Sequence, residues 1–156
     1  MPRVISIVSF ENRIDDLFKA TSILPDDIEI RSHWARYLCI LSYGYIETSV
    51  RNIFLVYAKN KAHAYVVNFV EKGLDRFRNA TMNNIKDLAR MFNQEWVEAI
   101  EQDLDQEVID AVNSLANNRH QISHGKHTGI SLVFVKKWHE KSRELIKYLE
   151  TLANID

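Results

Sequence analysis

Apolar residues recur at helical spacing along most of this chain, and the longest such pattern runs from about residue 27 to residue 59. One stripe consists of Ile30, Trp34, Leu38, Leu41, Tyr45 and Leu55, and a second consists of Cys39, Tyr43, Ile46, Val50, Phe54 and Tyr57. A helix that is apolar on most of its faces is normally buried, with partners on several sides. The pattern therefore predicts a long central helix, whose start Asp26 and Asp27 can cap and charge.

Shorter helical patterns lie on both sides of this central one. They cover approximately residues 5–22, 62–78, 81–92, 93–100, 103–124 and 131–153. Thr81 and Asn93 are expected to cap two of these helices, and Asp103 with Gln106 has the spacing of a capping box. No run alternates strictly between apolar and polar residues, as a half-buried strand would. We therefore expect an all-α fold, an antiparallel helical bundle with extra short helices, forming a single domain over residues 1–156.

Length and composition fit this expectation. A chain of 156 residues with 46% hydrophobic residues is long enough to bury a core, and its four glycines and two prolines argue against a loop-rich or all-β fold. The single cysteine, Cys39, cannot form an intrachain disulfide and is expected to pack in the core. The apolar run at residues 4–10 is too short to span a membrane and does not form a signal peptide. Together these features predict a cytoplasmic protein without a membrane contact.

The charge balance limits how the chain could bind nucleic acid. A formal net charge of -1 excludes a generally basic coat, so any contact with RNA must come from a local patch. One region is locally basic, through Lys72, Arg76, Arg78, Lys86 and Arg90. We interpret it as a solvated face, with a groove for an RNA backbone as the alternative.

The densest cluster of reactive side chains lies at 117–125, Asn-Asn-Arg-His-Gln-Ile-Ser-His-Gly, where a helical pattern ends. Arg119 falls on the same stripe as the apolar residues Val108, Val112, Leu115 and Ile122. A buried arginine is costly unless an anion meets it. Arg119 is therefore expected either to have an acidic partner inside the fold or to lie where the stripe opens into a cleft.

One helix alone does not aim Arg119 and His124 at the same point. His124 comes five residues later, roughly 140° round an ideal helix. Gly125 is a typical residue just beyond a helix C-terminus. A bend at the helix end, or a second copy of the chain, would be needed to bring the two side chains together.

An arginine, four residues, a histidine and then a glycine at a helix end resembles the catalytic motif of the HEPN family. Arg119 and His124 fill the two main positions, and His120 stands where the family commonly has Asn or Asp. The segment 35–58, which contains Gly-Tyr-Ile-Glu at 44–47 and then Val-Arg, resembles the long helix of the bacterial RiboL-PSP-HEPN type. The resemblance spans most of the chain.

The resemblance implies a metal-independent endoribonuclease without a cofactor. The RNA 2′-hydroxyl would attack the neighbouring phosphorus and leave a cyclic phosphate. His124 would transfer protons and Arg119 would bind the phosphate oxygens. Supporting or substrate-binding roles would fall to His120, Ser123, Asn118, Lys126, Glu47 and Arg51.

The resemblance also implies partners for this chain. Two copies of the motif would face each other across a homodimer, so that Arg119 of one copy could meet His124 of the other. Relatives of this kind often act in bacterial toxin–antitoxin or phage-defence systems, which implies an antitoxin protein as a further partner.

The residues alone leave other interpretations open. His120, His124 and His127 have a spacing that could hold zinc, although no fourth ligand is evident. A non-catalytic helical module that binds RNA, a nucleotide or a protein is the main alternative to the nuclease. Arg119 could be a structural buried ion pair, with His124 an exposed residue at the helix end.

Glu47 and Arg51 have two interpretations of their own. They are four residues apart in the central helix, which favours an intrahelical salt bridge. The functional alternative places one of them against the Arg119 site.

Overall fold

The computed structural model describes residues 4–155, and within this range it contains seven α-helices, one 3₁₀ turn and no strand. The helices are α1 (Ile5–Ala20), α2 (Ile28–Lys61), α3 (Ala64–Leu74), α4 (Met82–Phe92), α5 (Gln94–Asp103), α6 (Gln106–Ser123) and α7 (Leu132–Leu152). The 3₁₀ turn, Thr21–Ile23, directly follows α1. The all-α prediction is confirmed.

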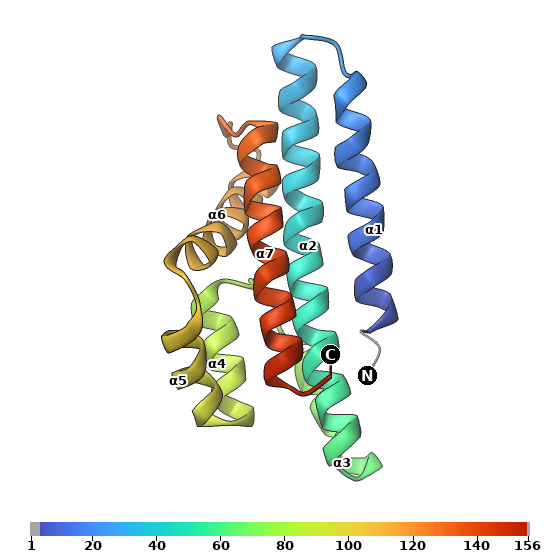
Figure 1. Ribbon diagram of the computed structural model, residues 1–156, viewed down its shortest axis with the longest axis vertical. Helices are drawn as coiled ribbons and strands as arrows, with labels where there is room; N and C mark the ends of the chain where they lie inside the picture. The colour runs from blue at the N-terminus through green and yellow to red at the C-terminus, as the bar shows by residue number, and fades with distance from the viewer. Residues whose placement is uncertain (1–3, 156) are drawn as a thin grey trace.

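The long helix α2 is the centre of the fold. It packs against α1, α3, α6 and α7, and Figure 1 shows α1 and α7 running alongside it. Residues of both predicted stripes are buried, among them Leu38, Tyr45, Ile46, Val50 and Phe54. Helices α4 and α5 pack on each other, away from α1. The predicted central helix is therefore confirmed.

Three of the predicted helix caps are present. The Asp27 carboxylate accepts a hydrogen bond from the Ile30 N–H at 2.9 Å. The Thr81 hydroxyl accepts from the Asn84 N–H at 3.2 Å, and the Asn93 side chain caps α5 in the same way. These side chains satisfy N–H groups that have no partner within their helices.

The predicted capping box at the start of the motif helix is wrong. The N-cap of helix α6 is Asp105, two residues later than expected, and its side chain makes no capping bond. Asp103 instead ends α5, and its carboxylate accepts from the Tyr148 hydroxyl at 2.9 Å. The Gln106 amide donates to Asp110 at 2.9 Å. A tertiary bond to α7 thus competes with the local motif for Asp103, which sequence spacing cannot reveal.

The third helix is shorter than predicted and ends at Leu74. The chain then turns through Asn79, which has a positive φ of 57°. This turn buries Ala80, whose N–H donates to the Tyr43 hydroxyl of α2 at 3.0 Å. A contact with the central helix therefore shapes the segment between α3 and α4.

A polar group of side chains joins α1, α2 and α7 inside the bundle. The buried Glu11 accepts a hydrogen bond from the Tyr45 hydroxyl at 2.6 Å. Arg143 lies 3.7 Å from the other Glu11 oxygen, and it donates to Asp15 at 2.9 Å. The buried Glu11 carboxylate needs these partners, so its bonds link α1 to α2 and α7, while Arg143 and Asp15 remain partly exposed.

His139 is buried against this group. Its ring lies 5.4 Å from the Tyr45 ring and 5.6 Å from the Phe18 ring, and neither ring nitrogen has a hydrogen-bond partner in the described part of the chain. Burial, and secondarily the charge of Arg143, lowers the pKa of His139 to about 4. His139 is therefore neutral near pH 7.

Candidate active site

The motif helix α6 ends in a well-defined turn. Gly125 has a φ of 68°, its N–H donates to the Ile122 carbonyl at 3.0 Å, and the Lys126 N–H donates to the Gln121 carbonyl at 3.0 Å. This pair of bonds is a Schellman motif, which needs a left-handed residue just beyond the helix. The turn fixes the orientation of His124, the last residue before the glycine. The predicted role of Gly125 as the helix stop is confirmed.

Arg119 lies where the apolar stripe of α6 leaves the core. Val108, Val112 and Leu115 are buried, whereas Arg119 is exposed. Its guanidinium lies over the ring of Tyr43, 5.0 Å from the ring centre. No carboxylate among residues 4–155 forms an ion pair with it. Of the two predicted environments, the buried ion pair is therefore wrong for the described residues: Arg119 is exposed, with an aromatic face beneath the cation.

Tyr43 connects Arg119 to the Glu47 and Arg51 pair. The Tyr43 hydroxyl donates to one Glu47 oxygen at 2.7 Å, and the Arg51 guanidinium lies 2.9 Å from the other. The hydroxyl also accepts from the Ala80 N–H. The predicted intrahelical salt bridge is therefore present, and the same pair lies one side chain away from Arg119.

Nothing in the sequence marks Tyr43 as a site residue. It belongs to an apolar stripe of α2 and is only 4% exposed, so its pattern is that of a core residue. Burial, and then the hydrogen bond to Glu47, raises the pKa of Tyr43. The hydroxyl consequently stays protonated and remains a donor to Glu47. In the sequence, its (i, i+4) spacing from Glu47 is the signal that could have linked Tyr43 to the site.

The two histidines of the motif lie against each other. The His120 and His124 ring centres are 4.4 Å apart, with the rings tilted by 60°. Both residues are exposed at the end of α6. Two imidazoles in contact can serve as a proton acceptor and a proton donor for the same substrate.

Three other residues of this segment were predicted to support the site, Asn118, Ser123 and Lys126. The Ser123 hydroxyl donates to the His120 carbonyl at 2.9 Å, and the Asn118 amide donates to the Ser114 carbonyl at 2.8 Å. These two side chains bond to the backbone of their own helix. Lys126 is exposed in the following turn.

No described contact joins Arg119 to His124 within one chain. Five residues of α-helix separate them by about 7.5 Å along the axis and about 140° round it. The structure thus assembles two neighbouring groups at one helix end. One is Arg119 with Tyr43 and Glu47, and the other is the pair of imidazoles.

The zinc interpretation finds no ligand cluster. Among residues 4–155, no three His, Cys, Asp or Glu side chains are grouped so that they could hold a metal ion. His127 lines a separate cavity beside the start of α7. Within that same range, no helix is long and apolar enough to cross a lipid bilayer.

Comparison with known proteins places this chain in a family. A family model described as RiboL-PSP-HEPN matches residues 8–154, which include all of the side chains described above. Searches of curated proteins and of solved structures gave no match. The match covers nearly the whole chain, and the all-helical fold agrees with it. This chain therefore belongs to the RiboL-PSP-HEPN family.

Proposed function

We propose that this protein is a metal-independent endoribonuclease whose active centre is the Arg119 and His124 end of α6. One observation carries the proposal. An exposed guanidinium held over an aromatic ring lies on the same helix end as two imidazoles in contact. Family membership supports the same conclusion, because HEPN-type domains are often ribonucleases.

Arg119 is suited to bind the scissile phosphate. A guanidinium presents a planar fork of N–H donors that matches two phosphate oxygens, and it keeps its charge at every relevant pH. The Tyr43 ring holds one face of the guanidinium by a cation–π contact and leaves the N–H edges free for a ligand. Charge that develops on the oxygens of the pentavalent phosphorus would be stabilised there.

The imidazoles are suited to move the protons of the reaction. His124 would take the proton of the RNA 2′-hydroxyl as its oxygen attacks the phosphorus. The bond from phosphorus to the 5′-oxygen then breaks, and that oxygen takes a proton from the second imidazole, His120. The products are a 2′,3′-cyclic phosphate and a 5′-hydroxyl. Positioned proton transfer of this kind contributes on the order of 10²–10⁴-fold to the rate.

A homodimer would bring the two groups of side chains together. Arg119 of one protomer would face His124 of its partner, which overcomes their separation round a single helix. Exposed apolar side chains support an interface here. Tyr37 and Ile40 precede Tyr43 on α2 by less than two turns, and they are 43% and 42% exposed.

The biological setting is proposed from the family. A dimeric ribonuclease of this type would act as the toxin of a bacterial toxin–antitoxin or phage-defence system. An antitoxin protein would then be its neutralising partner, and the cytoplasm its place of action.

An RNA cleavage assay with matched variants tests the proposal. Wild type, Arg119→Ala, Arg119→Lys and His124→Ala are incubated with labelled RNA, each with and without a chelator. We expect cleavage by wild type in both conditions and a loss of at least about 10²-fold in Arg119→Ala and His124→Ala. Arg119→Lys should recover only part of the activity, because lysine lacks the planar fork.

Arg13→Ala is the control for the loss of a positive charge. Arg13 is exposed on α1, and Figure 1 shows α1 apart from α6, so it lies outside both the proposed site and the basic region. Its activity should equal that of wild type. Full activity of Arg119→Ala, or activity abolished by the chelator alone, would contradict the proposal. RNA binding without cleavage by wild type would favour the non-catalytic module.

A further inference from the structure

A groove of about 660 Å³ lies between α3 and α4, in the half of the bundle away from the start of α2 (Figure 1). Most of its lining is apolar, and Phe69 of α3 and Met91 of α4 belong to it. Two arginines of the turn that follows α3, Arg76 and Arg78, line it as well. We call this feature the α3–α4 groove, and none of its residues was assigned to the proposed active centre.

The structure pairs two of the five cations that form the basic region of the sequence. Lys86 lies 3.3 Å from Glu101, and Arg90 pairs with Asp87. Asp87 is the one carboxylate among the described residues that line the groove, so its charge is already compensated. The cations of α4 are therefore engaged with carboxylates of this chain.

Arg76 and Arg78 keep their charges without a carboxylate partner. Both are exposed, and neither forms an ion pair within the described range, 4–155. Arg78 donates to the Phe77 carbonyl at 3.1 Å, and a guanidinium carries five N–H donors, so most of them remain available. The carboxylates of Glu71 and Asp75 are exposed nearby, but these two residues do not line the groove. The groove therefore presents two permanent positive charges beside apolar side chains.

The apolar side chains of the groove are open to solvent. Phe69 is 80% exposed and Met91 is 84% exposed, and Tyr65, one turn before Phe69 on α3, is exposed as well. Every nucleic-acid base has a π face that can stack on such a ring. Exposed rings beside unpaired cations are the features with which proteins bind single-stranded nucleic acid.

The turn that carries the two arginines is anchored at the proposed active centre. The Ala80 N–H donates to the Tyr43 hydroxyl at 3.0 Å, and the Arg119 guanidinium lies 5.0 Å from the centre of the Tyr43 ring. Arg78 is two residues before Ala80, so the Arg78 Cα lies within about 17 Å of the Arg119 guanidinium carbon. One RNA strand could therefore meet Arg119 and the groove within a small number of nucleotides.

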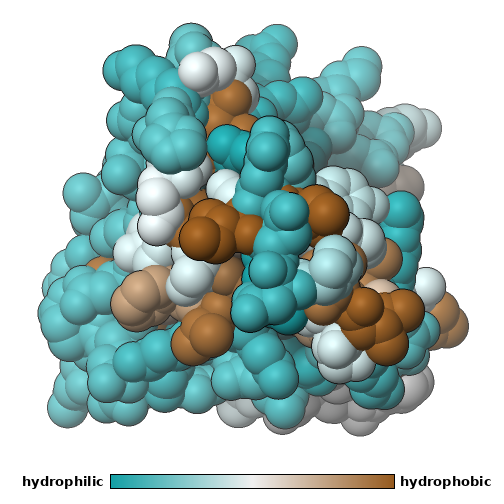
Figure 2. Space-filling model, turned by 90° about the horizontal axis from the view of Figure 1, so that it is seen from above, coloured by the Kyte–Doolittle hydropathy of each residue, from teal (hydrophilic) through white to brown (hydrophobic). Residues whose placement is uncertain are grey.

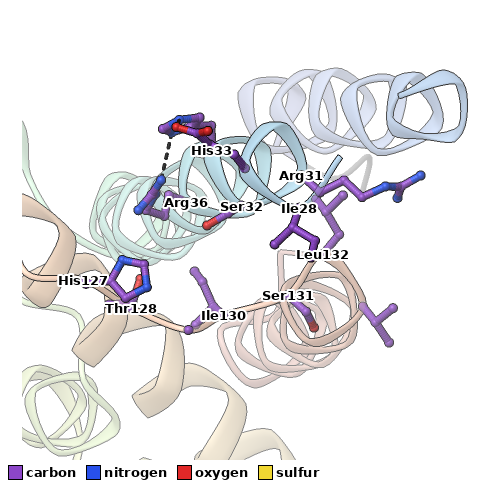
Figure 3. Close-up of a pocket in the computed structure, with 13 residues that line it drawn as sticks. Ile28, Arg31, Ser32, His33, Arg36, His127, Thr128, Ile130, Ser131 and Leu132 are labelled. Carbon is purple, nitrogen blue, oxygen red and sulfur yellow. Dashed lines mark hydrogen bonds and ion pairs between the residues drawn. The ribbon is translucent and has the colours of Figure 1, made fainter. Parts of the chain in front are cut away.

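The larger cavity at the other end of the molecule differs from this groove. It has a volume of about 890 Å³ and lies between the first turns of α2 and the start of α7 (Figure 3). Its Arg36 lies 2.8 Å from His33, and its Arg31 donates to two backbone carbonyls before α2. Figure 2 looks onto this end and shows apolar side chains set among hydrophilic ones. Both arginines of that cavity thus bond to groups of this chain.

We propose that the α3–α4 groove binds the single-stranded RNA substrate beside the cleaved bond. The inference rests on the proposed ribonuclease function for its choice of RNA. Arg76 and Arg78 bind phosphates, and Phe69 stacks on a base. The groove holds the strand and takes no part in proton transfer. Of the two interpretations of the basic region, we thus favour the RNA groove, because an acidic helix of a partner protein would not use its continuity with Arg119.

Gly73 allows one charge to be placed at the groove without disturbing the fold. It lines the groove from α3, and a Cβ atom at this position would meet no other atom within 4 Å. Gly73→Glu and Gly73→Gln introduce side chains of nearly the same shape that differ by one negative charge. Both residues form helix more readily than glycine, so neither variant should lower the melting temperature.

Binding measured without cleavage tests the groove separately from the nuclease. A labelled single-stranded oligoribonucleotide is titrated into His124→Ala protein, alone and combined with each groove variant, at several salt concentrations. We expect Gly73→Glu to bind about fivefold more weakly than Gly73→Gln at low salt, with a smaller difference at high salt. Arg78→Ala should reduce the slope of log K against log salt by about 0.7, which corresponds to one lost phosphate contact.

Phe69→Ser tests the stacking contact. Because stacking is not screened by ions, this variant should bind at least about fivefold more weakly at every salt concentration. Ile23→Ser is its control, since Ile23 is a similarly exposed apolar residue of the 3₁₀ turn after α1. Arg13→Ala is the control for the loss of a positive charge, and both controls should bind RNA as the His124→Ala protein does.

Equal RNA affinity of Gly73→Glu and Gly73→Gln, with an unchanged salt slope in Arg78→Ala, would overturn the RNA groove. If these variants instead changed only the binding of an acidic amphipathic peptide of Glu and Leu, the groove would be a site for a partner helix. If they changed only the oligomeric state, it would be a contact between copies of this chain. Every readout is taken in the His124→Ala background, so a wild type that binds RNA through the groove without cleaving it would contradict the nuclease alone.

Discussion

Removing one oxygen atom, by Tyr43→Phe, tests the support beneath Arg119. The ring that lies under the guanidinium remains, but the hydroxyl loses its 2.7 Å bond to Glu47 and the buried Ala80 N–H loses its acceptor. A hydrogen bond to a charged group contributes about 1.5–3 kcal/mol, and an unsatisfied buried N–H costs about 1–3 kcal/mol. The two costs add up. Because Arg51 still pairs with Glu47, we expect the unfolding free energy to fall by an amount near the lower end of their sum, about 3 kcal/mol.

Urea unfolding followed by tryptophan fluorescence measures this loss. For a chain of 156 residues, about 3 kcal/mol corresponds to a melting temperature lower by roughly 6–12 °C. Tyr43→Leu removes the ring as well, so it should cost about 0.5–1 kcal/mol more for the lost cation–π contact. The cavity left in the core adds to that cost, because Tyr43 is buried. Tyr43→Phe should also keep more RNA cleavage per folded molecule than Tyr43→Leu, because a ring remains beneath Arg119. An unfolding free energy of Tyr43→Phe within about 0.5 kcal/mol of wild type would refute the expected loss, since that is the usual scatter of surface substitutions.

Three further predictions concern the core and the helix end. The pKa of His139 is lowered by burial to about 4, so the unfolded chain binds a proton between about pH 6.5 and 4 that the folded chain does not. Stability should therefore be full above pH 6.5 and fall by about 3 kcal/mol toward pH 4, and His139→Phe should remove that part of the pH dependence in thermal melts. Gly125→Ala forces a side chain into the left-handed region at φ 68° and should cost about 1–2 kcal/mol, whereas Gly125→Asn should cost clearly less; equal melting temperatures would contradict this. Burial raises the pKa of the Cys39 thiol to about 12, so iodoacetamide should label Cys39 only in denaturant, and rapid labelling of the native protein would contradict its buried position.

Most of the fold could be predicted from the sequence because the helix signals are local. The two apolar stripes of α2 require a central helix, and Asp27, Thr81 and Asn93 cap helices at the predicted positions. The errors occur where a distant residue competes with a local rule. Asp103 bonds to Tyr148, which is 45 residues away, and so does not cap α6.

The sequence indicates the residue types of the proposed site but not the contacts that support them. Arg119, His120 and His124 follow from the motif, and Gly125 follows from its place at the helix end. Tyr43 looks like a core residue in the sequence, and only the packing of α6 against α2 places it beneath Arg119. The cavity beside α7 combines residues more than 90 positions apart, Arg36 and Thr128 among them, which helical periodicity cannot relate.

The central claim is that Arg119 and His124 act on one phosphodiester from opposite protomers, and complementation measures it directly. Arg119→Ala and His124→Ala proteins, each inactive alone, are unfolded together, refolded and assayed for RNA cleavage. In a mixed dimer, one composite site regains both residues and the other loses both, so an equal mixture should recover about 25% of wild-type activity. Recovery near that level, with none in either variant alone, is the predicted result. An inactive mixture that contains mixed dimers would contradict the claim, as would cleavage by either variant on its own.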